Sequence, residues 1–147
     1  MEFYLQGLKS QIRNKDDRGA TMIAPLTLAY MGDAVFETYI RQYLIENNKL
    51  LLKDFHNRAV SYVKAEAQAE IVGQLKESLT QEEWSIIKKG RNQKTTRVPK
   101  NVKVADYKHA TGFETLLGYL FFNNSFERLM EIMDMSVKII NNKEKGA

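Results

Sequence analysis

The sequence predicts an all-α protein with a single domain. Apolar residues recur at helical spacing along most of the 147 residues, and residues typical of helix starts and ends separate these segments. No stretch shows the strong apolar and polar alternation of a strand, and there is no internal repeat or linker. A chain of this length buries roughly 68–70% of its unfolded surface, so one core is expected to stabilise it.

The first predicted helix follows Pro25, a residue favoured in the first turn, and ends near Asn47. Its apolar stripe predicts the buried face, and Asp33 lies at the margin of that stripe, directly after a glycine. Burying a carboxylate is unfavourable unless another group pairs with it. The stripe consists of Leu28, Gly32, Val35, Phe36, Tyr39 and Tyr43.

Two more helices are expected between residues 54 and 90. A long one covers roughly residues 54–76, which combine apolar positions at helical spacing with Ala, Glu, Gln and Lys. A short one begins at a capping box formed by Thr80 and Glu83 and ends at Lys88, Lys89 and Gly90.

The fourth predicted helix, roughly residues 107–122, repeats the pattern of the first. Glu114 lies at the margin of an apolar stripe, and Gly118 follows one turn later. Because glycines let two helices approach closely, Asp33 and Glu114 could meet over a cleft. Two carboxylates there would repel each other unless a proton or a cation lay between them. A fifth helix is expected from the Asn124-Ser125 cap through Ile140.

One segment, residues 88–103, carries the whole positive excess of the chain. It has seven basic residues and no acid, whereas the rest of the chain has 15 basic and 18 acidic residues. A solvated loop is the simpler interpretation, but its Asn, Gln and Thr residues also suit phosphate contact. The candidate RNA-binding residues are Lys88, Lys89, Arg91, Lys94, Arg97, Lys100 and Lys103.

Two motifs in this order resemble the endonuclease domain of ribonuclease III. They are "YMGDAVFE" at residues 30–37 and "TGFETLLGYLF" at residues 111–121, with "FHNRAVSYVKAEAQA" between them. The resemblance covers roughly residues 26–133. It is closest to the short branch called Mini-ribonuclease III, which consists of the nuclease domain alone, and the "GRNQKTTRVPKN" segment looks like the basic loop of that branch.

The resemblance assigns the metal ligands and catalytic residues to Asp33 and Glu114. The family pattern has two further acids, but Ala29 and Thr111 occupy those positions here. Both departures are similar to the Mini-ribonuclease III pattern. Mg²⁺ commonly binds through one or two carboxylates plus substrate phosphate, so the remaining pair could suffice. Thr111 and Glu37 are candidates for support of the metal or its waters, although a salt bridge is the simpler role for Glu37.

The activity implied by the resemblance is Mg²⁺-dependent hydrolysis of double-stranded RNA, leaving 5′-phosphate and 3′-hydroxyl ends. The implied substrate is the precursor of large-subunit (23S) ribosomal RNA, and ribosomal proteins are further candidate partners. The alternative is a catalytically inactive module that binds double-stranded RNA or the ribosome. The resemblance also implies a homodimer with Leu26 and Tyr30 at the interface, although Tyr30 could instead be an ordinary core residue.

The expected organisation is an N-terminal extension at residues 1–22 that the pattern leaves unassigned, a catalytic domain at residues 23–141 and a tail at residues 142–147. No double-stranded-RNA-binding domain is expected. The polar start does not resemble a signal peptide, and no apolar run approaches 18 residues, so the expectation is a cytoplasmic protein without a membrane partner. Cysteine is absent, which excludes disulfides and thiolate chemistry.

Overall fold

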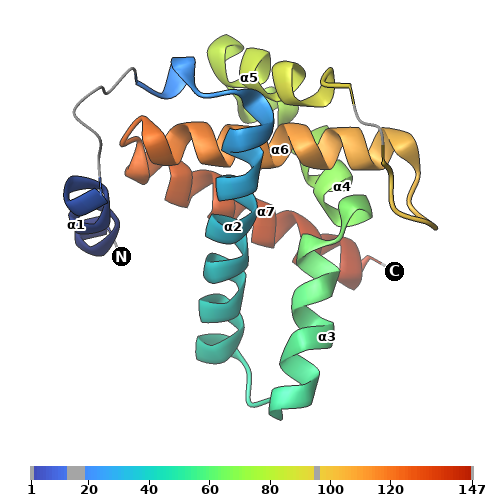
Figure 1. Cartoon of the computed structure of the whole chain (residues 1–147). Coiled ribbons are helices and arrows are strands. Elements are labelled where there is room, and N and C mark those ends of the chain that lie inside the picture. The colour runs from blue at the N-terminus through green and yellow to red at the C-terminus, as the bar shows by residue number, and fades with distance from the viewer. Residues whose placement is uncertain (1, 13–18, 95–96, 147) are drawn as a thin grey trace.

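The computed structural model describes residues 2–12, 19–94 and 97–146, and their regular structure is entirely helical. The all-α prediction is therefore confirmed. The α-helices, labelled in Figure 1, are α1 (Glu2–Ile12), α2 (Pro25–Asn47), α3 (Leu52–Val63), α4 (Ala65–Leu75), α5 (Gln81–Arg91), α6 (Val104–Phe122) and α7 (Phe126–Lys145). Two short 3₁₀ turns, Ala20–Met22 and Lys76–Ser78, precede α2 and follow α4.

Helix α6 is the centre of the fold. Every residue from Ala110 to Phe121 is buried except Glu114, which is half-buried. Helices α2, α4, α5 and α7 all pack against α6, and Figure 1 shows α6 running across the middle of the molecule. A helix that is apolar on nearly all sides belongs in such a central position, and a carboxylate on it calls for a local explanation.

The expected long helix at residues 54–76 is wrong, because the chain breaks it into two helices at Lys64. This residue has an extended backbone, with φ −63° and ψ 154°. The break lets α3 pack along α2 while α4 turns onto α6 and α7. Figure 1 shows α2 and α3 as an arm that extends beyond the other helices. Neither glycine nor proline marks the break, so the pattern of side chains did not predict it.

The other predicted boundaries agree with the structure to within a few residues. The capping box is present, because the Glu83 amide donates to Thr80 Oγ1 over 3.0 Å and the Thr80 amide donates to Glu83 Oε1 over 2.9 Å. Helix α5 continues through Gly90 to Arg91. Gly90 is needed for packing, since a Cβ there would lie 2.3 Å from Thr115 Oγ1. Across the described residues, no helix is both long and apolar enough to cross a membrane.

Candidate active site at the crossing of α2 and α6

Two glycines allow α2 and α6 to touch through their backbones. A Cβ on Gly32 would lie 1.8 Å from the carbonyl oxygen of Glu114, and a Cβ on Gly118 would lie 1.9 Å from the carbonyl oxygen of Leu28. No side chain fits at either position. Because Gly32 rests on the backbone of Glu114, the next residue of α2, Asp33, is held beside the Glu114 side chain. The predicted approach of the two helices is confirmed.

The two carboxyl groups interact at the edge of the core. Asp33 is exposed, whereas Glu114 is half-buried. The pKa of Glu114 is raised to about 9, first by burial and then by a hydrogen bond with Asp33 and the negative charge of Asp33. Glu114 is therefore protonated at neutral pH when no cation is present. The proton on Glu114 removes the repulsion that two close negative charges would otherwise have.

A third helix reaches the pair through Gln68 of α4, a residue that the sequence interpretation missed. Its side chain is 2% exposed, and a hydrogen bond from it to Glu114 opposes the rise in the pKa of that carboxyl group. The signal was present in the spacing, because Gln68, Val72 and Leu75 lie on the buried face of α4. A polar residue in an otherwise apolar stripe marks a position where a side chain has a specific partner.

Replacing Glu114 with glutamine is expected to increase stability at alkaline pH. The folded protein holds a proton on Glu114 up to a pKa of about 9, whereas the unfolded chain releases it near 4.5. Folding stability contributed by this group therefore falls as the pH rises from about 5 toward 9. In urea unfolding across this range, the free energy of unfolding of Glu114→Gln should increase relative to that of the parent protein as the pH rises. The exposed control Glu46→Gln should show the same dependence of unfolding free energy on pH as the parent. If Glu114→Gln also shows the parental dependence, the assigned protonation of Glu114 is wrong.

The two positions where the family pattern has additional acids contribute no carboxylate. Ala29 is 8% exposed, and Thr111 is 7% exposed with its hydroxyl donating to the carbonyl of Tyr107 over 3.0 Å. Glu37, one turn after Asp33, accepts a hydrogen bond from Arg41 Nε over 3.1 Å. This geometry agrees with the salt-bridge interpretation of Glu37, and its proposed support of a metal stays a prediction, as does that of Thr111.

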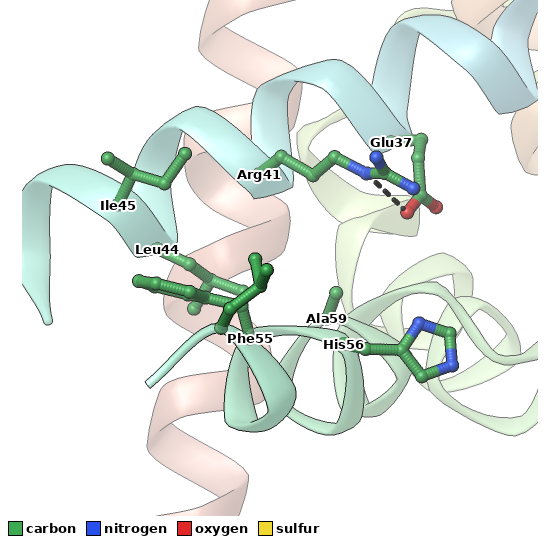
Figure 2. A pocket seen from close by; sticks show the side chains of 8 residues that line it. Glu37, Arg41, Leu44, Ile45, Phe55, His56 and Ala59 are labelled. Atoms are coloured by element: carbon green, nitrogen blue, oxygen red, sulfur yellow. Dashed lines mark hydrogen bonds and ion pairs between the residues drawn. The ribbon is translucent and has the colours of Figure 1, made fainter. Parts of the chain in front are cut away.

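A separate pocket of about 370 Å³ opens between α2 and α3, and Figure 2 shows the side chains that line it. The Glu37–Arg41 pair lies at one side, and the rest is mostly apolar. His56 of α3 lines this pocket, whereas the other histidine, His109, contacts the carbonyl of Ala105 through Nδ1 over 2.8 Å. Among the described residues, neither histidine joins Asp33 and Glu114 in a group of three that could hold a metal.

Residues 88–103, called here the basic segment, join the end of α5 to the start of α6, the helix that carries Glu114. Thr95 and Thr96 lie outside the described residues. Arg91 is half-buried, with its guanidinium 6.0 Å from the ring centre of Trp84, and Lys76 lies 4.9 Å from the same ring. The other six basic side chains of the segment are exposed to solvent, as the phosphate-binding interpretation requires: Lys88, Lys89, Lys94, Arg97, Lys100 and Lys103.

Comparison with known proteins connects these features to one family. Residues 26–125 match the model of the ribonuclease III domain. A Mini-ribonuclease 3 of Thermoanaerobacter sp. (strain X514) is 41% identical over 95% of this chain and 99% of its own length. The Mini-ribonuclease 3 of Staphylococcus aureus is 35% identical over 88% of this chain and 98% of its own. The crystal structure of a Fusobacterium nucleatum protein has a TM-score of 0.72 at 28% identity, covering 85% of this chain and 98% of that chain.

Proposed function

Because the chain belongs to the ribonuclease III family, we propose that it is a Mg²⁺-dependent endoribonuclease that hydrolyses double-stranded RNA at the Asp33–Glu114 pair. The observation that carries this proposal is the meeting of the two carboxyl groups at a glycine contact between α2 and α6. The products are RNA ends with a 5′-phosphate and a 3′-hydroxyl. The catalytic domain spans residues 23–141, between an N-terminal extension at 1–22 and a tail at 142–147.

The residues at the crossing fit a hard divalent cation. Within residues 2–12, 19–94 and 97–146, no group of three or more His, Cys, Asp or Glu side chains could hold a metal, so no third residue of these types joins the two carboxyl groups. Mg²⁺ often binds through one or two carboxylates together with waters and substrate phosphate. The raised pKa of Glu114 supports the fit, because a cation would replace the proton that otherwise separates the two acids.

Each part of the chain then has a chemical task. When bound, Mg²⁺ supplies Lewis-acid polarisation of the phosphate and activation of the attacking water. Asp33 and Glu114 would hold the ion, and the close backbone contact at Gly32 and Gly118 keeps the two side chains together. No side-chain nucleophile is needed. The basic segment binds RNA phosphates, since the groove geometry of duplex RNA favours recognition through phosphates and 2′-hydroxyls.

The second candidate function is an inactive module that binds duplex RNA or the ribosome. The absence of acids at Ala29 and Thr111 is the observation in its favour. Incubating a long RNA duplex with the protein, with and without Mg²⁺, separates the two. We expect Mg²⁺-dependent cleavage. A shift in gel mobility without cleavage at any Mg²⁺ concentration would favour the inactive module instead.

We further propose that the cellular substrate is the precursor of large-subunit (23S) ribosomal RNA. The resemblance of the two motifs and the basic segment to Mini-ribonuclease III implies this choice. The protein would then act in the cytoplasm, with ribosomal proteins as further partners. Mapping the 23S precursor ends in cells that lack the protein tests this assignment separately from the activity on model duplexes.

Removing three charges from the basic segment is expected to weaken RNA binding and its dependence on salt. Each phosphate contact contributes roughly 0.9 to the slope of log affinity against log salt, a value for duplex DNA that we apply to RNA. The combined change of Arg91, Lys94 and Arg97 to Ala should therefore flatten the slope by roughly two to three units if all three side chains contact phosphate. Turnover at saturating RNA should fall much less than affinity.

A matched control for this variant removes the same charge from α7. Lys138, Lys143 and Lys145 are exposed, and their combined change to Ala leaves the basic segment intact. The slope of the control should stay close to that of the parent. Equal slopes for both triple variants would show that the basic segment is only solvated and that other surfaces bind the RNA.

Dimerisation is the other interaction proposed from the family. Two apolar side chains of α2 support it, since Tyr30 is 84% exposed and Leu26 is 44% exposed in the single chain. Sedimentation should give a dimer at micromolar concentration, and Tyr30→Asp should weaken it at least tenfold. Val104→Asp, at a residue of α6 that is 54% exposed, serves as the control. A monomeric parent that still cleaves both strands would contradict this proposal.

A further inference from the structure

The side chain of Gln68 is buried at the point where α3 ends and α4 begins. Its Nε2 donates to the carbonyl oxygen of Val63, the last residue of α3, over 3.0 Å. Its Oε1 is buried and has no hydrogen-bond partner, the only such side-chain atom among the residues that the structure describes. A buried oxygen without a partner is unfavourable and rare in native proteins, so this atom calls for an explanation.

The orientation of the amide is set by its neighbour. The carbonyl of Val63 can only accept a hydrogen bond, so the nitrogen of the Gln68 amide must face it. Turning the amide over would place two oxygens against each other. The unpartnered Oε1 therefore belongs to the side chain as it stands and does not result from an exchanged oxygen and nitrogen.

The same side chain touches the candidate active site. Gln68 donates a hydrogen bond to the Glu114 carboxyl group, which in turn interacts with Asp33. Because oxygen and nitrogen of one amide are bonded to the same carbon, the unpartnered Oε1 lies one amide group away from the Glu114 carboxyl group. Amide oxygens are ordinary neutral ligands for hard divalent cations. Helix α4 can therefore offer one neutral oxygen to a cation held by the carboxylates of α2 and α6.

We propose that Gln68 is a positioning residue of the Asp33–Glu114 site, which orients the Glu114 carboxylate through Nε2 and presents Oε1 as a third oxygen toward the divalent cation. This inference rests on the proposed function, because it assigns Gln68 a part in the same metal site. It accounts for the unpartnered oxygen. It also compensates in part for Ala29 and Thr111, which leave the crossing with only two acids.

Direct binding of Mn²⁺ alone, measured by titration calorimetry without RNA, tests the assignment. We compare the parent with Gln68→Leu, Gln68→Glu and the control Gln74→Leu, which lies on the same helix and bonds Glu70 at the surface. Gln68→Leu should weaken Mn²⁺ binding at least tenfold, within the range typical of residues that support metal ligands. Gln68→Glu should bind at least as tightly as the parent, and Gln74→Leu should match it.

The comparison of the two Gln68 variants separates a role at the metal from a structural one. Neither Leu nor ionised Glu can donate to the Val63 carbonyl, so a purely structural role predicts that both variants bind Mn²⁺ equally poorly. Recovery with Glu would place an oxygen of this side chain next to the cation, a position that a purely structural role does not require. Circular dichroism checks that both variants fold. If Gln68→Leu fails to fold, Gln68→Glu decides alone: parental or tighter binding supports the inference, and weaker binding overturns it.

Two further outcomes distinguish this inference from the function on which it rests. If the parent cleaves RNA and binds Mn²⁺ while Gln68→Leu binds it with the parental dissociation constant, the assignment of Gln68 is wrong and the proposed function stands. If the parent neither binds Mn²⁺ nor cleaves RNA in Mg²⁺, the proposed function fails and the inference fails with it.

Discussion

Asp33→Asn and Glu114→Gln are each expected to lower RNA cleavage by about three orders of magnitude or more and to leave duplex binding largely intact. Each change removes one of the two carboxylates of the site, and stabilisation of the transition state by a metal is worth several kcal/mol. Since about 1.4 kcal/mol corresponds to a factor of ten in rate, the loss spans several factors of ten. Neither change empties the core, because the replacements have nearly the same shape.

The measurement is single-turnover cleavage of a labelled RNA duplex at saturating Mg²⁺, with binding followed by gel shift. Glu46→Gln provides the matched control, since it makes the same chemical change at an exposed position of α2. It should cleave at the parental rate. Near-normal turnover of Asp33→Asn or Glu114→Gln would show that the two carboxylates are not the metal site.

The variant Glu37→Gln tests the role of Glu37, the acid one turn after Asp33. Glu37 lies one turn after Asp33 but is paired with Arg41. If Glu37 only forms that surface salt bridge, its loss should change stability by less than about 1 kcal/mol and leave cleavage close to normal. A large drop in cleavage would instead assign it to the support of the metal.

Gly32→Ala and Gly118→Ala are expected to be the most destabilising small substitutions in the chain. The added methyl group would lie less than 2 Å from a backbone oxygen of the facing helix in both cases, so α2 and α6 must separate. Overpacking that forces backbone shifts costs about 1–3 kcal/mol or more, and we expect the upper end here because neither contacting backbone can turn away. The melting temperature should fall by roughly 6–12 °C.

Gly73→Ala is the control for these glycine variants. Gly73 lies within α4, is exposed, and has no atom within 4 Å of the position that a Cβ would take. Alanine there should stabilise the protein by roughly 0.5–1 kcal/mol, because glycine is unfavourable inside a helix. Parental melting of Gly32→Ala would mean that the two backbones are not in contact.

The glycine variants also connect stability to the site. Separating α2 from α6 moves Asp33 away from Glu114, so the Gly32→Ala protein that remains folded at low temperature should bind Mn²⁺ more weakly than the parent. The Gly73→Ala protein should bind it normally. If Gly32→Ala weakens metal binding although both carboxylates are still present, the backbone contact sets the spacing of Asp33 and Glu114.

The helical periodicity predicted most of α2, α5, α6 and α7, because each of these helices buries a face whose spacing is visible in the residues. It placed the α2 stripe slightly wrong, since Ile40 and Leu44 are more deeply buried than Tyr39 and Tyr43. It also merged α3 with α4, since the break at Lys64 results from packing against different partners. Helix α1 was not predicted at all.

The sequence by itself determined the helical class, the two acids at the margins of apolar stripes and the single basic segment, because these follow from residue type and spacing within one element. Only the tertiary structure decided that Gly32 rests on the backbone of Glu114, that the pKa of Glu114 rises to about 9, and that Gln68 forms a hydrogen bond with Glu114. These features depend on distances between residues far apart in the chain. Such distances are set by how closely helices pack, and periodicity along one helix contains no information about them.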